Sequence, residues 1–216
     1  MKNKLAFTLA EVLVTLGIIG VVSAMTVPTL MQNYQRQSYV TQLHKTYNEI
    51  SQALLRYQTD RNAINLSEAG LSSQDAVNNF ITTYFKNVKE CDTMNNCFAS
   101  SYKAMDGGTI NNYSVNVKSY VFASGVSIRP LYSKSGAKLI NIGLDINGQK
   151  GPNIGGRDLF WFYVYNNGVI DDTPIDANTV APMTSAERDT QFTTYCNSTA
   201  DGCFGKILND NWQMTY

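Results

Sequence analysis

Histidine is nearly absent from this chain of 216 residues, in which His44 is the only one. A metal centre built from several histidines is therefore excluded within one chain. An excess of one charge is also missing, because 17 Lys and Arg balance 17 Asp and Glu. The composition thus gives no sign of binding to nucleic acid or to anionic lipid.

Motifs for nucleotide chemistry are absent as well. The sequence contains no phosphate-binding loop and no dinucleotide fingerprint. Residues 135–138 match the SxxK pattern of penicillin-recognising enzymes, but its companion Ser-Asp-Asn and Lys-Thr-Gly motifs are missing. No catalytic constellation is left, so we expect that the chain is not an enzyme.

Cysteine is scarce. The four cysteines lie in two pairs that are close in sequence, Cys91/Cys97 and Cys196/Cys203. Five or six intervening residues fit the CxxC spacing of zinc sites poorly. We expect two local disulfides in an exported chain, each stabilising it by roughly 2–3 kcal/mol on the chain-entropy account. Four reduced thiols in a cytosolic protein are the alternative, and the apolar N-terminus argues against it.

One long uncharged run stands out, from Val12 to Met31, and it follows two lysines near the N-terminus. Its length suits a helix that crosses a bilayer of about 30 Å, and the lysines would hold the N-terminus in the cytoplasm. Glu11 stands at the head of this run. A charge in mid-membrane costs about 2.5–3.5 kcal/mol, so Glu11 needs an explanation.

The helical pattern continues beyond the run, and it predicts one helix from about Phe7 to Tyr57. Apolar residues at steps of three and four form a seam along it. The seam consists of Val40, Leu43, Tyr47, Ile50, Leu54 and Tyr57. His44 follows a seam position and is expected to face solvent.

A second amphipathic helix is predicted after the loop at residues 62–74, with Ser72 and Asp75 at its start. Its apolar face would comprise Val77, Phe80, Ile81, Tyr84, Phe85 and Val88. A short helix is predicted after Thr184, which stands in capping-box register with Glu187.

From Tyr113 the apolar period changes to two, which indicates strands at 113–122 and 138–146. Residues 158–170 read as a hairpin with an Asn-Gly turn, and the C-terminus as a disulfide loop followed by a strand. The expected fold is α+β: a long N-terminal helix, half membrane-spanning and half amphipathic, packed on a C-terminal antiparallel β-sheet.

The stretch AFTLAEVLVTLGIIGVVSAMTVPTL, residues 6–30, resembles the N-terminus of type IV pilins and type II secretion pseudopilins. Their precursors carry a basic leader, and their mature chains begin with Phe and have Glu at the fifth position. Here the cut would follow Ala6, where the family usually has Gly, so that Phe7 comes first and Glu11 fifth. Gly20 and Pro28 also fall where the family commonly has them. A weaker resemblance to pilin-like proteins covers residues 143–168 and 203–216.

The resemblance implies a leader at 1–6, a long helix at 7–60 with a transmembrane segment at about 9–31, and a periplasmic α+β domain at 61–216. It implies a single-pass protein of the bacterial inner membrane, with its N-terminus cytoplasmic, which later enters a cell-envelope or surface filament. Its implied partners are a prepilin peptidase, an assembly ATPase with its platform protein, and copies of itself or related pilins. No cofactor or nucleic acid is implied.

For Glu11, the resemblance implies that its carboxylate meets the amino group on Phe7 of a neighbouring subunit. Within one helix these groups lie about 6 Å apart along the axis, so the pairing would set the offset between subunits. Between Gly20 and Pro28 the helix is expected to lose hydrogen bonds in the filament. The alternative is that both residues are ordinary helix breakers.

The segment DINGQKGPNIGGRD offers oxygen ligands for calcium from Asp145, Asn147, Gln149, Asn153 and Asp158. It lacks the EF-hand glycine position and the terminal Glu. We favour a glycine-rich turn whose Asn and Asp side chains bond their own backbone.

A secreted soluble binding protein is the competing interpretation. Val22 and Ala24 fit a signal-peptidase site, with cleavage after Ala24. Glu11, which interrupts the apolar core of such a signal, argues against it.

Overall fold

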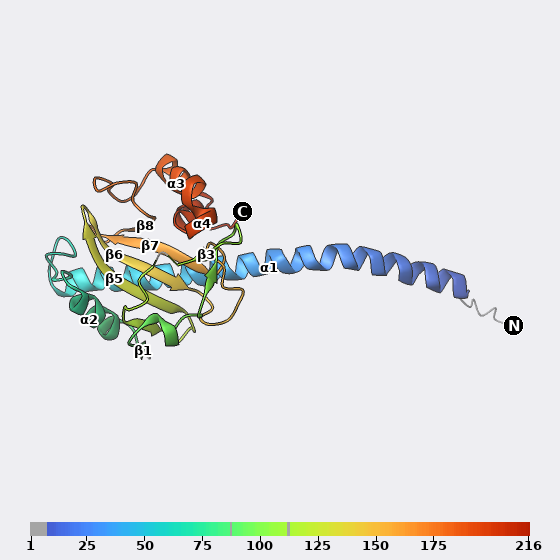
Figure 1. The fold of residues 1–216 in the computed structure, drawn as a ribbon, viewed down its shortest axis with the longest axis horizontal. Helices are drawn as coiled ribbons and strands as arrows, with labels where there is room; N and C mark the ends of the chain where they lie inside the picture. The colour runs from blue at the N-terminus through green and yellow to red at the C-terminus, as the bar shows by residue number, and fades with distance from the viewer. Residues whose placement is uncertain (1–7, 87, 112) are drawn as a thin grey trace. The chain divides into compact units, whose positions relative to one another are not determined.

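The computed structural model describes residues 8–86, 88–111 and 113–216 (Figure 1). Its first element is α1, a single helix at Leu9–Asp60. The described chain divides between Ser38 and Tyr39 into two compact units. The first unit holds the apolar half of α1, and the second holds the amphipathic half together with all later elements.

The amphipathic half of α1 belongs to the hydrophobic core of the second unit. Leu43, Ile50 and Leu54 of the predicted seam are fully buried, and Tyr47 is partly buried against them. The same core contains sheet residues such as Ile142, and Figure 1 shows this half of α1 running behind the sheet. The seam is buried because steps of three and four keep side chains on one face of a helix.

Six strands form one sheet in the order β1-β4-β5-β6-β7-β8, and every neighbouring pair is antiparallel. The strands are β1 (Lys89–Cys91), β4 (Ser119–Val121), β5 (Ser127–Ser135), β6 (Lys138–Asp145), β7 (Leu159–Tyr165) and β8 (Ile170–Asp171). A smaller sheet pairs β2 (Tyr102–Lys103) with β3 (Thr109–Ile110). The α+β architecture expected from the sequence, a long N-terminal helix followed by an antiparallel sheet, is confirmed.

Short helices complete the second unit. They are α2 (Gln74–Tyr84), the 3-10 turn η1 (Met94–Asn96), α3 (Ser185–Gln191), the π-helical turn η2 (Phe192–Cys196), α4 (Asn197–Thr199) and α5 (Cys203–Asn209). The capping box predicted at Thr184 and Glu187 is present and begins α3. The start of α2 differs by one residue, because the Ser73 side chain, not that of Ser72, accepts the hydrogen bond from the Ala76 N–H.

Three sequence predictions were wrong in detail. The residues after Cys203 form α5 rather than a strand, because Phe204 and Ile207 are buried three residues apart, as on a helix. Helix α2 ends at Tyr84, so Phe85 and Val88 fall outside it. His44 does not simply face solvent: its ring stacks on Trp212 with a centroid distance of 3.9 Å.

Strand β5 was not predicted from the sequence, and only three residues of the stretch 113–122 form a strand. The sequence of β5 contains Pro130, which cannot donate to a ladder, and it shows no clear alternation of polar and apolar residues. β5 and β6 nevertheless form a hairpin with a two-residue turn, in which Ser135 pairs with Lys138 and Ser127 with Asp145.

Candidate functional site

The apolar half of α1 exposes large side chains around its whole circumference. In the first unit Leu13 is 61% exposed, Ile19 60% and Leu30 70%. By length and composition, α1 contains a stretch that could cross a membrane. A helix that is apolar all round needs lipid or other helices around it.

Threonine hydroxyls in this segment bond to the helix itself. Thr15 donates to the Glu11 carbonyl at 2.9 Å, and Thr26 donates to the Val22 carbonyl at 2.9 Å. Thr29 donates to a carbonyl one turn earlier in the same way. These bonds satisfy the hydroxyls without water, as an apolar environment requires.

Glu11 closes the N-terminus of α1 in a reciprocal capping arrangement with Thr8. The Glu11 carboxylate accepts hydrogen bonds from the Thr8 N–H at 2.8 Å and from its hydroxyl at 2.9 Å. The Glu11 N–H donates in return to the Thr8 hydroxyl oxygen at 3.2 Å. The sequence prediction omits Thr8, although the T-x-x-E spacing of a capping box is present at residues 8–11.

Helix α1 continues through both Gly20 and Pro28. Pro28 has no N–H, so it cannot donate to the carbonyl of Ala24. At Gly20 no heavy atom of the described residues, apart from the adjoining helix backbone and its two chain neighbours, lies within 4 Å of where a Cβ would stand. The helix therefore lacks one backbone hydrogen bond at Pro28, and its backbone has no side chain over it at Gly20. Ala6 and Phe7, the predicted processing residues, lie outside the described residues.

The structure brings together four of the five candidate calcium ligands. Asp145 ends β6 and is fully buried. Its carboxylate accepts hydrogen bonds from the Tyr102 hydroxyl and, at 3.2 Å, from the Asn147 N–H. Gln149 lies apart, because its amide donates to the Phe98 carbonyl at 3.2 Å.

Asp158, also fully buried, is held by the loop before β7. It accepts hydrogen bonds from the backbone N–H of Asn153 at 2.7 Å and of Ile154 at 2.6 Å. The Asn147 amide donates to it at 3.3 Å. Only the side-chain oxygens of Asn147 and Asn153 are buried there without a described hydrogen-bond partner. N–H and O–H groups of the chain already donate hydrogen bonds to both carboxylates, so the arrangement fits a cation only in part. These hydrogen bonds are the kind expected for the glycine-rich turn.

The free energy of unfolding of the second unit is expected to fall as the pH rises from about 4 to 7. Burial raises the pKa of Asp145 to about 7 and also raises the pKa of Asp158. In this window the folded state keeps protons that the unfolded chain has lost, so stability decreases with pH. One such group contributes about 1.4 kcal/mol per pH unit. Denaturant titrations of the full chain in detergent at pH 5 and pH 8 measure the difference.

The variant Asp145→Asn serves as the control for this pH dependence, because an amide has no proton to lose. Its stability should depend less on pH than that of the wild type. Part of the slope should remain, since burial raises the pKa of Asp172 to about 7 as well. A variant with the full wild-type slope would contradict the assignment to Asp145.

Both predicted cysteine pairs are bonded in the structure. Cys91–Cys97 connects β1 to the residue after η1, and Cys196–Cys203 connects the end of η2 to the start of α5. The second disulfide closes the loop that carries Asp201, a residue that the sequence prediction omits. Disulfides of this kind persist in oxidising compartments.

Residues 1–27 match the family model described as the prokaryotic N-terminal methylation motif. No curated protein and no solved structure matches the chain closely enough for comparison. The matched residues include the Thr8–Glu11 capping box and the first apolar turns of α1. The chain thus carries the prokaryotic N-terminal methylation motif, which is typical of type IV pilins and pseudopilins.

Proposed function

We propose that this protein is a structural subunit of a type IV pilus-like or type II secretion pseudopilus filament. The observation that carries the proposal is the methylation motif at residues 1–27, which leads into a helix with an exposed apolar surface. Such a surface is stable in a membrane before assembly, and in a bundle of like helices after it. The second unit supplies a separate core and two disulfides for the envelope.

In this proposal the precursor lies in the bacterial inner membrane, with its N-terminus in the cytoplasm and its C-terminal domain in the periplasm. A prepilin peptidase removes residues 1–6 and methylates Phe7. An assembly ATPase and its platform protein then move the helix, residues 7–60, into a filament of like subunits, which display the domain at 61–216. The chain is a substrate and a building block, not a catalyst.

Glu11 has two successive partners in this scheme. In the monomer its carboxylate caps α1 through Thr8. In the filament it would pair with the amino group on Phe7 of a neighbour, since a carboxylate in an apolar core needs a cation. The stretch from Gly20 to Pro28 would lose hydrogen bonds there, at the point where Pro28 already removes one donor.

The mature chain is expected to begin with a methylated Phe7 when the gene is expressed together with a prepilin peptidase. Mass spectrometry of the intact protein and of its N-terminal peptide measures both the cut and the added methyl group. The matched control is Ala6→Arg, which should remain uncut because the small residue before the bond is lost. A chain that begins at Met25 would instead establish cleavage by signal peptidase and a secreted protein.

A further inference from the structure

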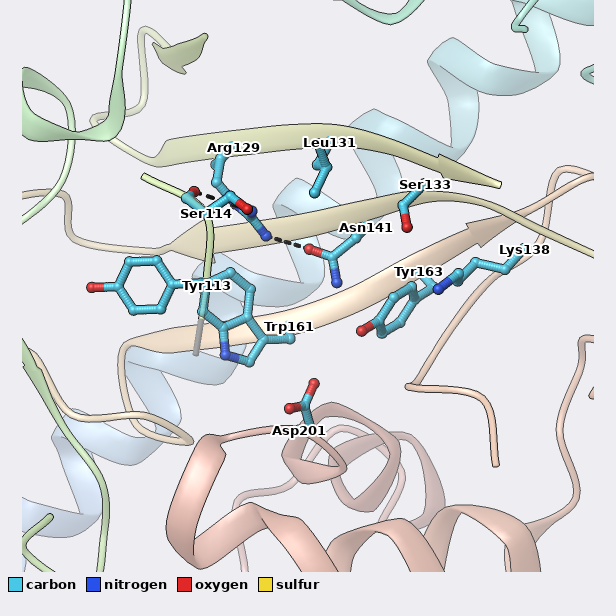
Figure 2. Close-up of a pocket in the computed structure, with 10 residues that line it drawn as sticks. All are labelled: Tyr113, Ser114, Arg129, Leu131, Ser133, Lys138, Asn141, Trp161, Tyr163 and Asp201. Atoms are coloured by element: carbon cyan, nitrogen blue, oxygen red, sulfur yellow. Dashed lines mark hydrogen bonds between the residues drawn. The ribbon is translucent and has the colours of Figure 1, made fainter. Parts of the chain in front are cut away.

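A cavity of about 180 Å³ lies over one face of β5, β6 and β7 (Figure 2). The side chains that line it alternate along the strands with core residues such as Ile142 and Phe162. Antiparallel register places Leu131, Asn141 and Tyr163 in one row across the three strands. The cavity therefore lies on the face of these strands opposite to the one that carries Ile142 and Phe162.

A glycine in the sheet shapes the cavity floor. Gly143 stands between Arg129 and Trp161 in the register of the three strands. A Cβ at Gly143 would collide with the indole ring of Trp161, so the ring lies directly over this backbone position. The Arg129 guanidinium is in turn 4.9 Å from the ring centroid. Because Gly143 has no side chain, the Trp161 ring can lie against the sheet with the Arg129 guanidinium over it.

Arg129 is a buried cation with no carboxylate within ion-pair distance among the described residues. It is 2% exposed, and no ion pair within 4.0 Å involves it in the described part of the chain. Its guanidinium donates to the Asn141 side-chain oxygen and to the Ser114 carbonyl, while its Nε–H has no described partner. A buried charge is costly unless an opposite charge meets it. Burial accordingly lowers the pKa of Arg129 to about 10.

A second cation and one acid complete the lining. The Lys138 ammonium lies 5.0 Å from the centroid of the Tyr163 ring. Figure 2 shows Asp201 across the cavity, facing Trp161 and Tyr163. Its two oxygens accept hydrogen bonds from the hydroxyls of Thr173 and Thr199, each at 3.0 Å. Two cations face one carboxylate, so the cavity has a surplus of one positive charge.

We propose that this cavity binds a single sugar unit that carries a carboxylate, such as a hexuronate. Arg129 and Lys138 would hold its carboxylate, and Asn141 and Asp201 would take hydrogen bonds from its hydroxyls. The cavity volume is more than ten times the roughly 10–15 Å³ that one water needs on the same measure, enough for one small ring. This binding activity goes beyond a role in filament architecture and does not depend on it. It would let the domain recognise an acidic polysaccharide at a terminal or side-chain residue.

Trp161 lines the cavity, so tryptophan fluorescence of the full chain can report on binding. The protein is kept in a polyoxyethylene detergent, because that detergent contains no sugar. Titration with glucuronate should give a saturable change with a Kd of about 1 mM or below. Glucose, which lacks the carboxylate, and acetate, which lacks the ring, should each bind at least tenfold more weakly.

Each alternative ligand class has its own outcome. Equal binding of acetate would overturn the sugar assignment in favour of a simple anion site. Equal binding of glucose would overturn the role of the two cations. A fluorescence signal that does not saturate with glucuronate would overturn the site itself.

The variant Lys138→Gln removes the half-buried cation, and we expect glucuronate affinity to fall about tenfold or more. Lys134→Gln is the matched control, because Lys134 lies on the same hairpin but is exposed and outside the cavity. It should leave the affinity unchanged. If Lys138→Gln melts like the wild type and binds glucuronate equally well, the proposal is wrong. Should Lys138→Gln fail to fold, Tyr163→Phe removes a hydroxyl that lines the cavity and should also lower glucuronate affinity; an unchanged affinity would contradict the proposal.

Discussion

Replacing Glu11 with alanine is expected to abolish incorporation of the protein into filaments while its insertion in the membrane remains intact. Insertion depends on the exposed apolar side chains that follow Glu11 in α1, and replacing Glu11 leaves these side chains unchanged. In a filament core, however, the amino group on Phe7 of a neighbour would lose its anion, and a buried charge left without its partner costs about 3–5 kcal/mol. Cell fractionation measures insertion, and electron microscopy of sheared filaments measures assembly.

The variant Glu11→Gln separates the two roles of this side chain. Glutamine keeps an oxygen that can accept from Thr8, so the capping box at the start of α1 should survive. It removes the negative charge, so assembly should fail as it does with alanine. Normal assembly of Glu11→Gln would show that capping, and not pairing with Phe7, is what the filament requires.

Replacing Arg188 with alanine should lower the free energy of unfolding by about 3–5 kcal/mol. Its partner Asp171 is fully buried in β8. The Asp171 carboxylate accepts from Arg188 Nε at 2.8 Å and from Nη2 at 2.7 Å, in a two-pronged pair between α3 and the sheet. Without the guanidinium, a charged group would remain in the interior with no cation. Urea titration of the full chain in detergent, followed by tryptophan fluorescence, measures the loss.

Lys118→Ala is the matched control for this experiment, because it also removes one cation from one ion pair. Lys118 pairs with Glu90, but their side chains remain 38% and 43% exposed. Water screens such a pair, so the expected change is about 1 kcal/mol or less. If the two variants lose similar stability, burial does not determine the strength of the Arg188–Asp171 pair.

Local patterns in the sequence were enough to predict several elements. The seam from Val40 to Tyr57 predicted the buried face of α1, because helical periodicity depends only on neighbours three or four residues apart. The Thr184–Glu187 capping box depends on an equally short spacing. Both cysteine pairs were predicted for the same reason, since each closes a short loop.

Contacts between distant residues could not be predicted in this way. Strand β5 was missed for a different reason: it contains Pro130 and has no clean alternation, although its hairpin partner β6 begins only three residues after it ends. The bond from Tyr102 to Asp145 joins residues 43 positions apart. No local rule indicates that such side chains will meet.

The sequence by itself determined the N-terminal motif, the apolar half of α1 and the position of Glu11 at its head, because these are properties of consecutive residues. Only the tertiary structure decided what the carboxylates and cations of the second unit do. Tyr102 donates to the Asp145 carboxylate across 43 residues of sequence, and Gly143 lets Trp161 lie beneath Arg129. Burial and partners fix the chemistry of a charged side chain, and both arise when separate elements of the chain pack together.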